Sequence, residues 1–260
     1  MSTRFVTLIV VLICSSSAQA GPSAQQRQRT FATLPDWSGV WIADDGIMTR
    51  LGLTNGPEGP GPGFKDRILG AHPPYNPEWE AKYLAAQKDR PSRPPTVECG
   101  FYYPGVMESP WVFEVLITPE ETAVIVAGRE IRHILTDGRT HPAEDERWPT
   151  PWGDSVGHWE GQTLLIDTVA VSTTGSTRQS GWNPMQSESA HYTERMRRVS
   201  QDRLEDQLTI DDPLAFTHPW TLTIPYKRVT NLDRLIHGDC MANDRNPVVD
   251  GKLTVAPPKP

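Results

Sequence analysis

The sequence predicts a mainly β protein: an antiparallel β-barrel of about eight or nine strands with one short N-terminal helix and long loops. Short apolar and β-branched runs follow one another with turn residues between them, as consecutive antiparallel strands require. No run is followed by a clear crossover helix, so a parallel sheet is not expected. A barrel and a sandwich both accommodate such strands. The Gly-x-Trp start at Gly39 and the meander after it favour the barrel.

The amino-terminal residues predict export. Residues 1–20 combine a positive charge, an apolar run over 5–13 and a small-x-small cleavage site at Ala18-Gln19-Ala20, which is the pattern of a secretory signal peptide. The protein is therefore expected to be periplasmic or secreted. Residues 21–35 are polar and Gln-rich, which is typical of a disordered leader. Residues 36–260 are expected to form a single barrel domain.

One helix is expected to begin near residue 77. Asn76 is a suitable N-cap, and Pro77 suits the first helical position. Trp79 and Tyr83 follow at helical spacing and would form one apolar face. The proline-rich run 90–95 would end the helix.

The remaining elements are expected to be strands. In chain order, they are 36–41, 111–117, 122–127, 130–135, 154–159, 163–169, 191–199, 203–210 and 220–226. Asp137-Gly138 is a strong turn signal, and Glu160-Gly161 joins two runs as a hairpin. In the last run, Trp220 and Leu222 share one face and Thr221 lies on the other, as a half-buried strand requires.

Composition argues against several classes of partner and cofactor. The chain has 25 Lys and Arg against 32 Asp and Glu, a formal net charge of −7, which suits neither a nucleic acid nor an anionic membrane. No segment after the signal approaches the roughly 20 apolar residues of a membrane span. The sequence has no phosphate-binding loop or dinucleotide fingerprint, and its seven histidines show no metal-site spacing. No cofactor or metal is expected, and the oligomeric state is left open.

Two cysteines, Cys99 and Cys240, remain once the signal is removed. In an oxidising compartment they are expected to form a disulfide, with two separate buried thiols as the alternative. Because the bond would close a long loop, it would contribute a few kcal/mol to stability.

Residues 153–157 match the G-x-S-x-G pattern of a serine nucleophile elbow. That motif requires a strand, a strained turn and then a helix, whereas here another expected strand follows. The two glycines are therefore interpreted as allowing a tight β-bend, and a serine hydrolase is rejected.

The strand expected at 191–199 carries charge on both faces. His191 and Arg195 point one way, whereas Tyr192 and Glu194 point the other. One face must meet the interior, where a charge is costly unless it is paired or used. Two interpretations stay open. Glu194 pairs with a neighbouring arginine in a structural network, or an arginine holds an anionic substrate while a histidine carries a proton.

Taken together, these segments resemble a group of exported bacterial proteins that mostly have no assigned function. The resemblance covers 36–41, 132–142, 152–161, 167–168, 191–195, 211–213 and 219–221. It implies a lipocalin-like (calycin-type) barrel. The chain is also similar, to a lesser degree, to sphingomonad proteins that process lignin-derived aromatic dimers by cofactor-free lyase chemistry. It departs from the group pattern at Asp154, where histidine is common, and at His133 and Leu135, where arginine and tyrosine are common.

The preferred hypothesis is a cofactor-independent carbon–carbon lyase that removes carbon dioxide or formaldehyde from a phenolic, lignin-derived compound inside the barrel. Such chemistry needs a base for the phenol, so that a quinone methide forms, and a cation for a departing carboxylate. The candidate catalytic residues are His141, His158, His191 and Tyr103, and the candidate substrate-binding residues are Arg132, Arg195, Glu194, Trp152 and Trp220. His191 and Arg195 are expected to face the ligand together. The alternative is a non-catalytic periplasmic carrier of an apolar or aromatic molecule.

Overall fold

A computed structural model gives the fold of the chain. It describes residues 23–44, 72–88, 103–108, 112–126, 130–173, 185–230, 232, 234–235, 248–249 and 252–253. The chain divides into two units, Met1–Thr33 and Leu34–Pro260. The expected signal peptide and the expected disulfide between Cys99 and Cys240 lie outside the described residues.

The first unit contains helix α1 (Ala24–Phe31), which lies within the segment expected to be a disordered leader. Ser23 caps this helix, because its Oγ accepts a hydrogen bond of 3.3 Å from the backbone N of Gln26. Serine at the N-cap and glutamine three positions later is a helix-start pattern. No residue of α1 is buried. The helix is therefore a local structure without a core, and the polar composition alone did not indicate it.

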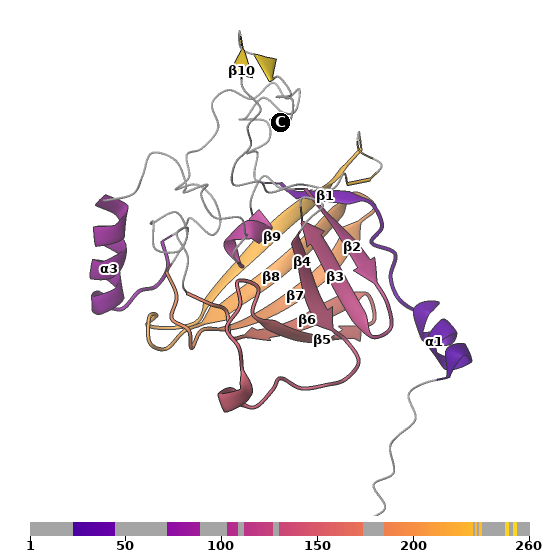
Figure 1. The fold of residues 1–260 in the computed structure, drawn as a ribbon, viewed down its shortest axis with the longest axis horizontal. Helices are drawn as coiled ribbons and strands as arrows, with labels where there is room; N and C mark the ends of the chain where they lie inside the picture. Colours follow the sequence, from indigo (N-terminus) through magenta and orange to yellow (C-terminus); the bar gives the residue numbers. More distant parts are fainter. Residues whose placement is uncertain are drawn as a thin grey trace, which may run out of the picture. The chain divides into compact units, whose positions relative to one another are not determined.

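The second unit is built on a closed barrel (Figure 1). Its strands are β1 (Val40–Ala43), β2 (Phe113–Ile117), β3 (Glu121–Val126), β4 (Glu130–Leu135), β5 (Asp154–Glu160), β6 (Thr163–Val169), β7 (His191–Ser200), β8 (Arg203–Asp211) and β9 (Trp220–Val229). Strand β1 pairs with β2 on one side and with β9 on the other, which closes the ring. The expectation of a mainly β protein with a barrel is confirmed.

The barrel is mixed, so the expectation of a purely antiparallel barrel is wrong at one place. Strands β4 and β5 are parallel and share the single pair Leu135–Val156. Every other neighbouring pair in the barrel is antiparallel. The physical reason is the long connection 136–153, which contains the short 3-10 helix η3 (Glu144–Glu146). A connection of this length can return the chain to the end from which β4 began, as a parallel pair requires.

The expected helix near residue 77 is confirmed as α3 (Pro77–Lys88). Asn76 caps it, since its Oδ1 accepts a 3.1 Å hydrogen bond from the backbone N of Trp79. The Asn76 amide also donates to the carbonyl of Leu214 at 2.8 Å, which ties the helix start to the loop before β9. No helix among the described residues is long and apolar enough to cross a membrane. A small hairpin of β10 (Val248–Val249) and β11 (Lys252–Leu253) completes the described elements.

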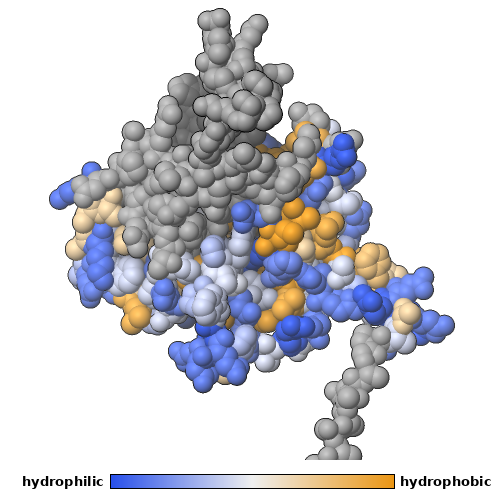
Figure 2. Space-filling model, in the orientation of Figure 1, coloured by the Kyte–Doolittle hydropathy of each residue, from blue (hydrophilic) through white to orange (hydrophobic). Residues whose placement is uncertain are grey.

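Alternating side chains fill the inside of the barrel. Trp37 and Trp41 are fully buried at its start, and Tyr103 and Met107 reach the same core from the segment around η2 (Gly105–Glu108). The described outer surface is mostly hydrophilic, with apolar patches on the face that Figure 2 shows. The core is therefore the barrel interior, and the buried polar side chains within it need an explanation.

Candidate functional site

An ion pair lies inside the barrel between Arg132 of β4 and Glu194 of β7. The two guanidinium nitrogens donate to the two carboxylate oxygens, Nη1 to Oε1 at 3.0 Å and Nη2 to Oε2 at 2.5 Å. Both side chains are only 1% exposed. A two-point contact of this kind fixes orientation as well as supplying energy. These two residues, both expected to bind substrate, are therefore brought together, but they bind each other.

Two hydroxyl groups complete the surroundings of Arg132. Its Nη2 also donates to Thr168 Oγ1 at 3.0 Å and to Ser155 Oγ at 3.4 Å. The two hydroxyl oxygens lie 2.8 Å apart, because Ser155 and Thr168 are directly paired across β5 and β6. Ser155 is thus a buried strand residue and not an exposed nucleophile. Gly153 before it has a φ of 72°, which fits the expected tight bend.

Tyr103 lies against the same arginine. The Cζ of Arg132 is 4.2 Å from the centre of the Tyr103 ring, and the ring meets that of Tyr192 edge to face at 5.1 Å. Burial, together with the negative charge of Glu194, raises the pKa of Tyr103 well above its ordinary value. The phenol therefore stays neutral and can act as a hydrogen-bond donor, as its expected role requires.

Asp206 of β8 is an ionisable side chain beside Glu194 that the sequence analysis missed. It is 1% exposed, and its carboxyl faces that of Glu194. Burial and the charge of Glu194 raise the pKa of Asp206 well above its ordinary value. Burial also acts to raise the pKa of Glu194, but the charge and hydrogen bonds of Arg132 outweigh it and the pKa is lowered. The two carboxyl groups therefore have opposite pKa shifts, and Asp206 holds its proton to a higher pH than Glu194 does.

The resulting buried cluster, hereafter the interior cluster, consists of Tyr103, Arg132, Ser155, Thr168, Glu194 and Asp206. Within it, the cation of Arg132 is paired with the carboxylate of Glu194. Two neighbouring carboxyl groups with pKa values driven apart are the arrangement that separates an acid from a base. The interior cluster is thus chemically able to accept one proton and donate another.

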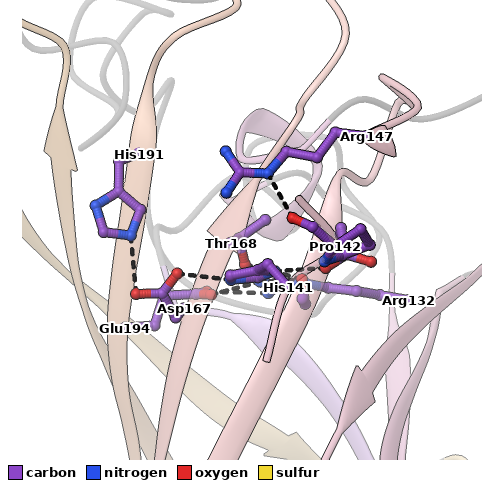
Figure 3. Close-up of polar contacts among 10 residues, drawn as sticks. Arg132, His141, Pro142, Arg147, Asp167, Thr168, His191 and Glu194 are labelled. Carbon is purple, nitrogen blue, oxygen red and sulfur yellow. Dashed lines mark hydrogen bonds and ion pairs between the residues drawn. The ribbon is translucent and has the colours of Figure 1, made fainter. Parts of the chain in front are cut away.

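A second polar group lies on the outside of the barrel wall (Figure 3). His141, from the connection 136–153, places Nδ1 on Asp154 of β5 and Nε2 at 2.8 Å from Asp167 of β6. The other oxygen of Asp167 lies 2.8 Å from Nε2 of His191, the first residue of β7. Two carboxylates and two imidazoles thus alternate along the outer face. They hold the connection 136–153 against three strands, and His141 is the most buried of them, with its side chain 14% exposed.

The expectation that the face of β7 with His191 and Arg195 points into the barrel is wrong. On β7 it is Tyr192, Glu194 and Met196 that are buried, so the face with His191 and Arg195 points outward. Arg195 is 54% exposed and lies 3.9 Å from Glu160. The large apolar side chains of Tyr192 and Met196 decide which face turns inward, since their burial contributes more than that of a charged side chain.

The remaining expected site residues lie apart from the interior cluster. His158 is on the outer surface near Glu160, with its side chain 67% exposed. Trp220 meets Phe216 edge to face, with the ring centres 6.0 Å apart. Trp152 is partly buried, and its Nε1 donates to Glu130 at 3.4 Å. The residue before Trp152, Pro151, accepts a 3.0 Å hydrogen bond at its carbonyl from the backbone N of Tyr103.

No protein-family model matches the chain, and no curated protein matches it either. Within the described part of the chain, no group of three or more His, Cys, Asp or Glu side chains is arranged to hold a metal ion.

The opposed pKa shifts lead to a prediction about stability. In the folded protein Asp206 keeps a proton that the unfolded chain releases near its ordinary pKa of about 4. Its contribution to stability is therefore lost as the pH rises from about 4 toward the raised folded value. Glu194, with a lowered pKa, acts in the opposite direction and is kept in the variant. We expect the free energy of unfolding of Asp206→Asn to fall less steeply with rising pH than that of the wild type. Urea unfolding across a pH series measures this, and parallel curves would contradict it.

Proposed function

We propose that the protein is an exported, cofactor-independent lyase with a lipocalin-like (calycin-type) barrel that acts on a phenolic, possibly lignin-derived compound in the barrel interior. The observation that carries the proposal is the buried carboxyl pair Glu194 and Asp206, whose pKa values are shifted in opposite directions, next to Arg132 and Tyr103. Strongly shifted pKa values with a specific charge partner are typical of functional sites. The resemblance to lignin-dimer lyases supports the substrate class.

The chemistry proposed for the cluster is a proton cycle. Glu194 accepts the phenolic proton while Asp206 protonates a leaving hydroxyl, which gives a quinone methide and water. The new Asp206 carboxylate then removes the proton of a hydroxymethyl group. Its carbon–carbon bond breaks to release formaldehyde, and the bonding electrons restore the aromatic ring as a phenolate. The phenolate regains its proton from Glu194, so both carboxyl groups return to their starting states.

Charge balance favours loss of formaldehyde over loss of carbon dioxide. The cation of Arg132 is already neutralised by Glu194, at 3.0 and 2.5 Å. A substrate carboxylate would bring a second negative charge into the interior with no free cation in the cluster to pair with it, and an unpaired buried charge is costly. The proposed substrate is therefore an uncharged phenol that carries both the leaving hydroxyl and a hydroxymethyl group. This changes the role expected for Arg132 from holding the substrate to keeping Glu194 ionised.

The test uses three matched sets of phenolic dimers, read by mass spectrometry. The first set carries a free phenol and a hydroxymethyl group, the second replaces the hydroxymethyl group with a carboxylate, and the third methylates the phenol. We expect formaldehyde and the shortened product from the first set only. Release of carbon dioxide from the second set would contradict the charge argument. Tight binding of all three sets with no product would favour the periplasmic carrier instead.

A further inference from the structure

Two places in the barrel wall have little backbone pairing between neighbouring strands: β1 and β2 share two residue pairs, and β4 and β5 share one. Among the described residues, β4 and β5 share only the pair Leu135–Val156. Their neighbours are joined far more extensively, with β5 and β6 paired all along Asp154–Glu160. We call the stretch between β4 and β5 on the amino-terminal side of Leu135 and Val156 the seam. Along the seam, side chains must close the wall.

An indole side chain bridges the amino-terminal end of the seam. Trp152, two residues before β5, donates from Nε1 to the carboxylate of Glu130, the first residue of β4, at 3.4 Å. This distance is near the long limit for a hydrogen bond, so the contact is weak. The ring is partly buried against the core. The contact between Trp152 and Glu130 therefore joins the two sides of the seam, and a change of rotamer at either residue would break it.

Two members of the interior cluster lie on the two strands that the seam separates. Arg132 lies on the β4 side and Ser155 on the β5 side, with Nη2 and Oγ 3.4 Å apart. Both residues are at most 4% exposed. Between β5 and β6, by contrast, a path through the wall would require several backbone hydrogen bonds to break together. At the seam mainly side chains would have to move.

We propose that the seam between β4 and β5 is the entrance through which a flat, uncharged aromatic ligand reaches the interior cluster, with Trp152 and Glu130 as its gate. The ligand class rests on the proposed function, whereas the position of the entrance does not. Because the gate is separate from the chemistry, its effect is on access to the cluster. Access can be measured without a substrate.

The experiment places a thiol behind the seam in the full mature protein. Ser155→Cys puts a small thiol at a buried position, and its alkylation by iodoacetamide is followed by peptide mass spectrometry, which separates it from Cys99 and Cys240. We expect Trp152→Ala in this background to raise the alkylation rate about tenfold, because it removes both the hydrogen bond and the packing that close the seam. Glu130→Ala keeps the indole but removes its partner, and we expect a smaller rise in the same direction.

Trp148→Ala is the matched control, because Trp148 belongs to the same connection but is 83% exposed. It should leave the rate unchanged. The rise in the alkylation rate of Trp152→Ala must also exceed the rise that a loss of global stability would cause. Urea unfolding of the same samples measures that loss.

Equal alkylation rates in the Trp152, Glu130 and Trp148 variants would overturn the proposed entrance and would place it at an end of the barrel instead. If Trp152→Ala does not fold, the Glu130→Ala variant decides alone. If Trp152→Ala speeds alkylation but the protein converts none of the phenols, the lyase proposal fails and the proposed entrance is still supported.

Discussion

Arg132→Met is expected to lower the free energy of unfolding by about 3–5 kcal/mol, the usual effect of removing one partner of a buried ion pair. The variant leaves Glu194 without its cation and next to Asp206, in a place where neither carboxyl reaches water. Chemical denaturation at neutral pH measures the loss. We also expect the variant to recover part of its stability as the pH falls, because protonation of Glu194 removes the unpaired charge.

The double variant Arg132→Met, Glu194→Met tests the reason for that loss. When both charges are replaced by apolar groups of similar size, the change in stability is often small or favourable. We therefore expect the double variant to be more stable than the Arg132→Met single variant. Arg195→Met is the surface control, since Arg195 is 54% exposed and its contact with Glu160 is 3.9 Å long. That change should cost no more than about 1 kcal/mol. A double variant less stable than the single would show that the cluster is held by shape and not by charge.

Asp206→Asn is expected to lower kcat by about 10²–10⁴-fold on a phenol that the wild-type protein converts, which is the usual contribution of a placed acid or base. The asparagine amide keeps the size of the carboxyl and still donates to Glu194, but it cannot give up a proton in the reaction. The affinity for the phenol should change little. Single-turnover kinetics separates the two quantities.

Glu205→Gln is the matched control for this prediction. Glu205 is the neighbour of Asp206 on β8, points to the other face and pairs with Arg197 at 3.1 Å on the outside. Its replacement should leave kcat at the wild-type value. If both variants convert the phenol at that value, Asp206 is a structural acid and the proton cycle proposed for the cluster is wrong.

Strand positions could be predicted because a period of two in the sequence is a local signal. The bounds expected for 130–135 and 163–169 are those of β4 and β6. The parallel pairing of β4 with β5 could not be predicted, since nothing within 136–153 specifies the end of the barrel to which that connection returns. The pairing of two strands depends on contacts between residues distant in the sequence.

The candidate site shows the same division between local and distant information. Arg132, Glu194 and Tyr103 could be identified as candidates from the sequence, because each interrupts or adjoins an apolar run. They meet in the structure. Asp206 was missed although the signal was present: it lies between Leu204 and Leu208 on one face of its strand, and both leucines are buried. The role of His141 depends on Asp167, 26 residues away in the chain, and so could not be read from local pattern.

The closure of the ring by β1 has a consequence for the order in which the protein folds. Residues 40–43 pair with residues 226–229, so the first strand of the barrel finds one of its two partners only when nearly the whole chain has been made. Until then, both faces of an incomplete sheet remain open to solvent, and β8 lacks one neighbour. Contacts between such distant parts of a chain slow folding, because the intervening loop must be closed first. We therefore expect a chain truncated before β9 to aggregate rather than form a smaller barrel, since it would expose the unpaired edges of β1 and β8.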